Sequence, residues 1–186
     1  MGKIFTTLVF VFLICKATAQ TTYIPDDNFE QALIDLGYDS PPLDNFVLTA
    51  NIENVVMLNI NGAGINDLTG IEDFEALEIL NCPSNNLSNI DISQNFNLLE
   101  LNVSNNNLNQ LDVTNNISLR KLGCNTNNLL TLNIMQNNKL RYLACTFNNL
   151  SSVNVSQNIF LDELFLDNNS INSIDLSQNI ELIFYP

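Results

Sequence analysis

Three cysteines at repeated intervals are the first residues of this sequence whose chemistry must be considered. They are Cys82, Cys124 and Cys145. If equivalent positions are neighbours in space, a Cys124–Cys145 disulfide is an alternative to free thiols, but it leaves Cys82 unpaired. The chain has no His, so a thiolate nucleophile lacks its usual base and a zinc site lacks enough ligands. We expect all three cysteines to be small apolar core residues.

Acidic residues at a common spacing are a second candidate for chemistry. Asp91, Asp112 and Asp175 share one position of a repeat, which Asn133 and Asn154 occupy in between. A column of carboxylates could bind calcium. However, the chain has only six Gly and lacks the glycine-rich nonapeptides of calcium-binding β-rolls. We favour solvated or turn-capping carboxylates, and keep calcium as the alternative. Glycoside hydrolysis needs a cleft and two different carboxylate environments, which a uniform column does not offer.

The distribution of charge predicts a binding site. The net charge of -14 argues against nucleic acid and anionic membrane surfaces as partners. Residues 20–119 contain 15 acidic residues and no basic residue. Residues 120–161 contain four basic residues and no acidic one, and residues 162–186 contain five acidic residues. A basic, aromatic spot could receive an anionic glycan or an acidic protein loop, whereas the alternative is ion pairing between neighbouring repeats. The members of this predicted spot are Arg120, Lys121, Lys139, Arg141, Tyr142, Phe147 and Phe165.

The elements that position these residues follow from a 21-residue repeat. Five units begin at Leu77, Leu98, Leu119, Leu140 and Leu161. In each, two apolar residues in the pattern L-x-L face one side of a short strand, and an Asn three positions later ends it. Its amide can bond the turn and the next coil. This Asn ladder comprises Asn85, Asn106, Asn127, Asn148 and Asn169.

The second half of each unit repeats the same rule, as in Ile90-Asp91-Ile92 followed by Asn95. This nesting suggests strands on two faces of each coil and little helix. One coil cannot bury its own apolar face, but stacked coils can. The spacing therefore predicts a repeat solenoid.

These repeats resemble the short bacterial class of the leucine-rich repeat family. Residues 55–76 form a 22-residue unit whose Asp67-Leu68-Thr69-Gly70-Ile71 resembles the internalin type, but Ala63 replaces the ladder Asn, so its turn should be less well fixed. The resemblance covers residues 55–181. It implies a leucine-rich repeat solenoid of the α/β class, largely β, with parallel strands on a concave face that binds partners.

The first 54 residues predict two further segments. Residues 1–19 have the Lys3 start, short apolar run and Ala17-Thr18-Ala19 site of a signal peptide; a retained anchor helix and a lipoprotein at Cys15 are the alternatives. Residues 20–54 form an N-terminal cap. In it, Asp27 and Glu30 have capping-box spacing and Gly37 ends a short helix. This cap with its repeats resembles secreted surface proteins of flavobacteria-like bacteria.

Residues 182–186 begin an incomplete sixth unit, for which we favour a truncated product; the alternative is that this apolar end docks on itself or another chain. No residue set predicts catalysis, a cofactor or a metal centre. We expect an exported, non-enzymatic protein, secreted or at the cell surface, that binds a protein or glycan through its concave face in adhesion or recognition. The alternatives are an interaction segment of a longer surface protein whose function lies in a missing C-terminal part, and an enzyme.

Overall fold

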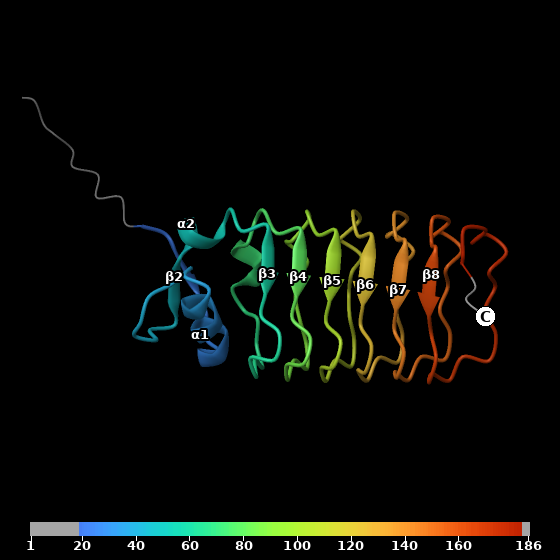
Figure 1. Ribbon diagram of the computed structural model, residues 1–186, viewed down its shortest axis with the longest axis horizontal. Coiled ribbons are helices and arrows are strands. Elements are labelled where there is room, and N and C mark those ends of the chain that lie inside the picture. The colour runs from blue at the N-terminus through green and yellow to red at the C-terminus, as the bar shows by residue number, and fades with distance from the viewer. Residues whose placement is uncertain (1–18, 184–186) are drawn as a thin grey trace, which may run out of the picture.

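The structure is a computed structural model that describes residues 19–183. The predicted signal peptide lies outside the described residues except for Ala19, as do the last three residues of the incomplete sixth unit. At the centre is a sheet of six parallel strands, which lie side by side in chain order (Figure 1). They are β3 (Met57–Asn59), β4 (Ile79–Asn81), β5 (Glu100–Asn102), β6 (Lys121–Gly123), β7 (Tyr142–Ala144) and β8 (Glu163–Phe165).

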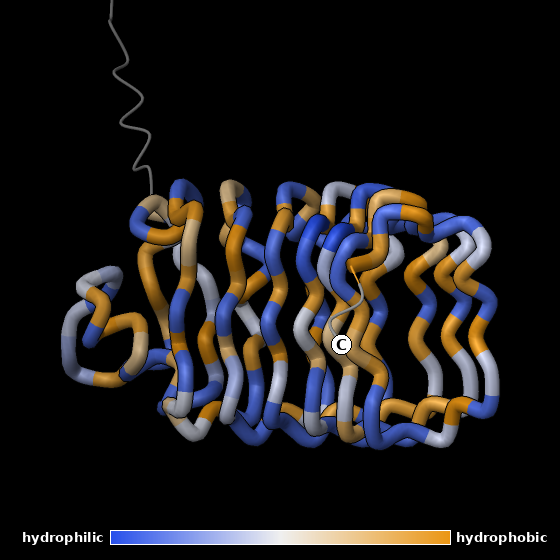
Figure 2. The backbone as a smooth tube through the Cα atoms, turned by 45° about the vertical axis from the view of Figure 1, so that its right-hand side comes forward, coloured by the Kyte–Doolittle hydropathy of each residue, from blue (hydrophilic) through white to orange (hydrophobic). Residues whose placement is uncertain are grey.

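The register of the sheet follows the repeat. Leu80 pairs with Leu101, and Leu101 with Leu122, so the middle residue of each strand stacks on its equivalent in the next coil. These leucines are buried, and one continuous apolar cluster extends from the N-terminal cap through the coils. Figure 2 shows the resulting alternation of apolar and polar segments along the coils. The parallel-strand solenoid predicted from the spacing is confirmed.

The prediction of strands on two faces is wrong. Apart from an isolated bridge between Asp112 and Asn133, the second half of each described coil has no strand pairing. The reason is local, because the Asp91 carboxylate accepts the N–H of Ser93 at 2.9 Å. The same turn recurs at the equivalent Asp or Asn of each later unit. An N–H that is satisfied within its own coil cannot pair with the next one.

Buried asparagines connect the coils where the second sheet is missing. Asn116, for example, donates from Nδ2 to the carbonyl oxygens of Ile92 and Asn95 in the preceding coil, at 3.0 and 2.9 Å. The cysteines are core residues as expected, since Cys82, Cys124 and Cys145 are free and fully buried. Burial raises the pKa of the Cys82 thiol to about 12.

The N-terminal cap packs two strands and two helices against the first coil. Strand β1 (Thr21–Tyr23) pairs antiparallel with β2 (Phe46–Leu48), beside α1 (Asp27–Asp35) and α2 (Thr49–Ile52). No described helix has the length and apolarity needed to cross a bilayer. The predicted stop at Gly37 is confirmed, because this residue has φ 80° immediately beyond the helix C-cap.

The predicted capping box on Asp27 and Glu30 is wrong. The N-cap is Asp26, one residue before the predicted position. Its side chain accepts the N–H groups of Asn28 and Phe29 in the first turn of the helix. Glu30 is instead fully buried and accepts the N–H groups of Asp44 and Asn45 at 2.7 and 3.0 Å. It therefore holds the loop before β2 rather than the start of the helix.

The turn at Ala63 is held by groups other than the absent ladder Asn. The Gly64 carbonyl oxygen accepts from the side-chain amides of Asn28 and Asn86, at 3.0 and 3.1 Å. In addition, Asp26 accepts the Asn66 N–H at 2.8 Å, which fixes the cap to this first unit. The same unit contains the short 3₁₀ helix η1 (Ile71–Asp73). Neighbouring side chains thus fix a turn that we expected to be loose.

Candidate binding groove on the sheet

A groove of about 580 Å³ crosses the outward face of the six-stranded sheet, which corresponds to the concave face of the family resemblance. Side chains alternate along a strand, so the first and third residue of each strand face outward and the second faces the core. The first positions form one column: Met57, Ile79, Glu100, Lys121, Tyr142 and Glu163. The third positions form another: Asn59, Asn81, Asn102, Gly123, Ala144 and Phe165.

The second column changes character in the middle of the sheet. Amides at β3 to β5 give way to Gly123 and Ala144, after which Phe165 follows at β8. Gly123 lines the groove and leaves a slot beside the Asn102 side chain, whereas Ala144 is only 2% exposed and does not line the groove. A Cβ at Gly123 would lie 3.2 Å from the Asn102 Oδ1, so a larger residue there would narrow this slot.

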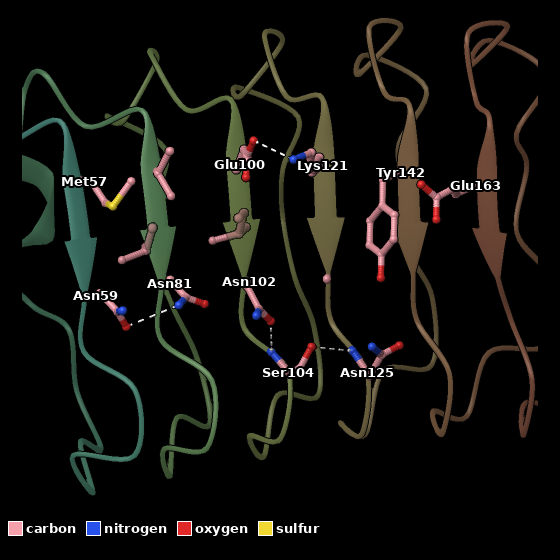
Figure 3. Close-up of a pocket in the computed structure, with 14 residues that line it drawn as sticks. Met57, Asn59, Asn81, Glu100, Asn102, Ser104, Lys121, Asn125, Tyr142 and Glu163 are labelled. Atoms are coloured by element: carbon pink, nitrogen blue, oxygen red, sulfur yellow. Dashed lines mark hydrogen bonds and ion pairs between the residues drawn. The ribbon is translucent and has the colours of Figure 1, made fainter.

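Polar side chains at the strand ends form a chain of hydrogen bonds (Figure 3). Asn102 Oδ1 accepts the N–H of Ser104 at 3.1 Å, and Ser104 Oγ accepts the N–H of Asn125 at 3.2 Å. Asn125 Oδ1 in turn accepts the N–H of Thr146 at 2.8 Å. The amide oxygens of both asparagines are thus committed to the protein. Their Nδ2 groups have no partner among residues 19–183.

Two of the cations near the groove are paired with acids of neighbouring coils. Lys121 Nζ lies 3.0 Å from Glu100 Oε1, and Arg141 contacts Asp162 Oδ2 at 2.7 Å. This is the ion pairing between repeats that the sequence offered as an alternative. The Lys121 and Arg141 side chains are 58% and 60% exposed, so each pair stabilises the fold by at most about 1 kcal/mol. Glu163 has no cationic partner in the described part of the chain.

Tyr142 and Phe165 form an aromatic pair at one end of the groove. Their ring centroids are 5.7 Å apart with the rings tilted by 50°. The Tyr142 ring lies over the sheet, with its hydroxyl directed toward the strand ends (Figure 3). Burial, and then the nearby Glu163 carboxylate, raises the pKa of the Tyr142 hydroxyl. This hydroxyl therefore stays neutral near pH 7.

The residues of the predicted basic spot do not form one cluster in the structure. Lys121, Tyr142 and Phe165 belong to the sheet, and Arg120 and Arg141 directly precede β6 and β7 at its rim. The other two lie apart from the groove. Lys139 is in the turn that leads to β7, and Phe147 follows that strand with φ 53° and is 59% exposed.

The predicted spot contains two residues that line the groove, Lys121 and Tyr142, and omits other lining residues such as Met57, Asn59, Gly123 and Ser104. Three of these four occupy the repeat columns of residues identified from the sequence, so aligning whole columns would have found them. Gly123 was not identified from the sequence because it has no side chain that could carry chemistry.

The predicted calcium column contains turn caps. Hydrogen bonds from residues two positions later lower the pKa of Asp91, Asp112 and Asp175. No three His, Cys, Asp or Glu side chains converge anywhere in residues 19–183 in a way that could hold a metal ion.

Comparisons with known proteins place this fold. No protein-family model and no curated protein sequence matches the chain. Among solved structures, the functional domain of InlJ from Listeria monocytogenes, which includes a cysteine ladder, is 30% identical with a TM-score of 0.62. That similarity covers 88% of this chain but only 46% of the InlJ chain, so this chain spans less than half of its length.

Two further structures share the fold at lower identity. Internalin C2 from Listeria monocytogenes is 18% identical with a TM-score of 0.71, over 90% of this chain and 78% of its own. The Leptospira interrogans leucine-rich repeat protein LIC12759 is 22% identical with a TM-score of 0.52, over 71% of this chain and 42% of its own. The 21-residue repeat, the parallel sheet and these neighbours show that the chain has a leucine-rich repeat solenoid fold like that of the internalins.

Proposed function

We propose that this protein is an exported, non-enzymatic binding protein that recognises an extracellular protein or glycan through the groove. One observation carries the proposal: the groove presents polar and aromatic groups that the fold does not use. The Nδ2 groups of Asn102 and Asn125 and the hydroxyl of Tyr142 have no hydrogen-bond partner in the described part of the chain. If folding were the only requirement at these positions, other small polar side chains could replace these groups.

The similarity to InlJ supports an interaction role. Because this chain spans less than half of InlJ, adhesion or recognition by this chain is our proposal. The contact residues would be Lys121 and Tyr142, which line the groove, and Phe165, which packs beside Tyr142. Arg120 and Arg141 would contact the ligand from the rim. Lys139 and Phe147, which lie apart from the groove, would contact only a ligand that extends beyond it.

An array of extracellular proteins and glycans tests this function. The exported protein should bind at least one array member above background, and Tyr142→Ala should weaken that binding. The matched control is Ile117→Ser, because Ile117 is 55% exposed and lies outside the groove. No binding to any member, or equal loss in both variants, would contradict the proposal.

The basic residues need a separate test because two of them are already paired with acids. A triple variant carrying Arg120→Ser, Lys121→Ser and Arg141→Ser removes the cations and leaves the aromatic pair in place. If cations contact the ligand, the variant loses binding to anionic array members, and the loss grows as ionic strength falls. Unchanged affinity would remove these three residues from the contact set.

A further inference from the structure

The amide and hydroxyl groups of the groove offer neutral hydrogen-bond donors to a ligand. Asn102 and Asn125 have committed their amide oxygens to backbone N–H groups, so only their Nδ2 donors are available to a ligand. The Ser104 Oγ accepts the Asn125 N–H, which leaves its own O–H to donate. These donors, with the neutral Tyr142 hydroxyl, suit the hydroxyl and ether oxygens of an uncharged ligand.

The charges of the groove disfavour an anion. Lys121 is the cation that lines the groove, and Glu100 neutralises it at 3.0 Å. Glu163 adds an unpaired carboxylate beside Tyr142, so the groove is negative overall, as is the whole chain at -14. The Glu163 carboxylate can accept hydrogen bonds from ligand hydroxyls. A polyuronate or sulfated chain would meet repulsion at this point.

The shape of the groove suits a flat ring. Gly123 lines the groove without a side chain and so leaves a slot between β5, which carries Asn102, and β7, which carries Tyr142. Figure 3 shows the Asn102 and Tyr142 side chains on these two strands. The π face of an aromatic ring is negative, and the C–H groups on one face of a pyranose are weakly positive, so the two attract when stacked. The neighbouring Phe165 ring, 5.7 Å away, extends the apolar surface by one coil.

Backbone pairing argues against a peptide as the ligand. The backbone groups of β4 to β7 pair with neighbouring strands on both sides, so a peptide lying in the groove cannot add to the sheet. An extended peptide relies on such main-chain hydrogen bonds for much of its affinity when it binds to a sheet. A peptide would have to bind by side chains alone.

We propose that the ligand of the groove is an uncharged polysaccharide, with one hexose ring stacked on Tyr142 over the slot at Gly123. This inference rests on the proposed function and narrows it to one ligand class. Neighbouring sugar units would follow the row of amide donors from Asn125 toward Asn102.

Affinity electrophoresis of the exported protein tests this ligand class. The gels contain one of four neutral glycans (a β-glucan, an α-glucan, a mannan or a galactan), an anionic polyuronate, or no polysaccharide. At least one neutral gel should retard the wild type, and the polyuronate gel should not. Tyr142→Ala should weaken that affinity about tenfold, the effect of losing one aromatic stacking contact. Tyr142→Phe keeps the ring and should retain most of the affinity.

Gly123→Phe fills the slot, and the Asn102 side chain, 3.2 Å from the new Cβ, must turn aside to admit it. The variant should abolish retardation, and circular dichroism should confirm an unchanged fold. Ile117→Ser is the control outside the groove. Absence of retardation in every neutral gel, or wild-type retardation of Gly123→Phe, would overturn the proposal.

The two proposals fail in different ways. If Gly123→Phe abolishes binding to a protein or to the polyuronate while no neutral gel retards the wild type, the ligand class is wrong and the groove remains the binding site. If Gly123→Phe leaves every measured interaction unchanged, the proposed function is wrong as well.

Discussion

Removing one ladder asparagine from the middle of the solenoid should be costly. Asn127 is 7% exposed, and its Oδ1 accepts the N–H of Leu108 at 2.9 Å. Its Nδ2 donates to the carbonyl oxygens of Val103 and Cys124 at 3.0 and 3.2 Å. In Asn127→Ala each carbonyl keeps a bond from another ladder asparagine, but the Leu108 N–H has no other partner among residues 19–183.

The expected loss follows from these contacts. A buried N–H without a partner costs about 1–3 kcal/mol, and each of the two lost bonds about 0.5–1.5 kcal/mol. We therefore expect Asn127→Ala to lower the free energy of unfolding by about 2–6 kcal/mol. The adjacent Asn128 is exposed and makes no side-chain hydrogen bond within the described residues, so Asn128→Ala should change this free energy by less than about 0.5 kcal/mol.

Urea unfolding followed by circular dichroism measures both variants. The slope of free energy against urea concentration must stay equal among the three proteins for the comparison to hold. A similar loss in the two variants, or a loss below about 1 kcal/mol for Asn127→Ala, would refute the assignment of this column to hydrogen-bonded coil corners.

Three further predictions concern the cap, the acidic column and the ion pairs. Asp26→Ala should lower the free energy of unfolding by about 1–2 kcal/mol, whereas the exposed Asp27→Ala should change it little; calorimetry that ranks them in reverse would restore the capping box on Asp27. Because hydrogen bonds lower the pKa of Asp112 below its usual value, its carboxylate stabilises the fold above that usual value near 3.8. This stabilisation disappears as pH falls through the lower folded-state pKa. The Tm of the wild type relative to Asp112→Asn should thus fall between pH 6 and pH 3, and a constant difference would contradict the shift. A double-mutant cycle on Glu100 and Lys121 should give a coupling below about 1 kcal/mol that weakens with added salt; a larger, salt-independent coupling would rule out a solvent-exposed pair.

The repeat columns could be predicted because stacking copies them from coil to coil. The position of Leu101 opposite Leu122 follows from the 21-residue spacing alone, and so does the shared burial of the cysteines. The same spacing also brought Lys121 beside Tyr142, which made part of the groove visible in the sequence.

Other features depend on contacts that a spacing does not specify. Adjacent aspartates both fit a helix start, and Asp26 is the cap because its second oxygen also accepts N–H groups of the first repeat's turn. The second face lacks strands because side-chain turns use the N–H groups that a ladder would need. The slot at Gly123 depends on where the neighbouring Asn102 and Ser104 side chains lie, which the repeat spacing does not specify.

The central claim is that the outward face of the sheet binds the ligand while the coil corners serve the fold. The most direct measurement is the affinity of wild type, Gly123→Phe and Ile117→Ser for the ligand that the exported protein binds most tightly on the array. We predict at least a tenfold loss for Gly123→Phe, no loss for Ile117→Ser, and the same circular dichroism spectrum for Gly123→Phe as for the wild type. Wild-type affinity in Gly123→Phe, or a greater loss in Ile117→Ser, would contradict the claim.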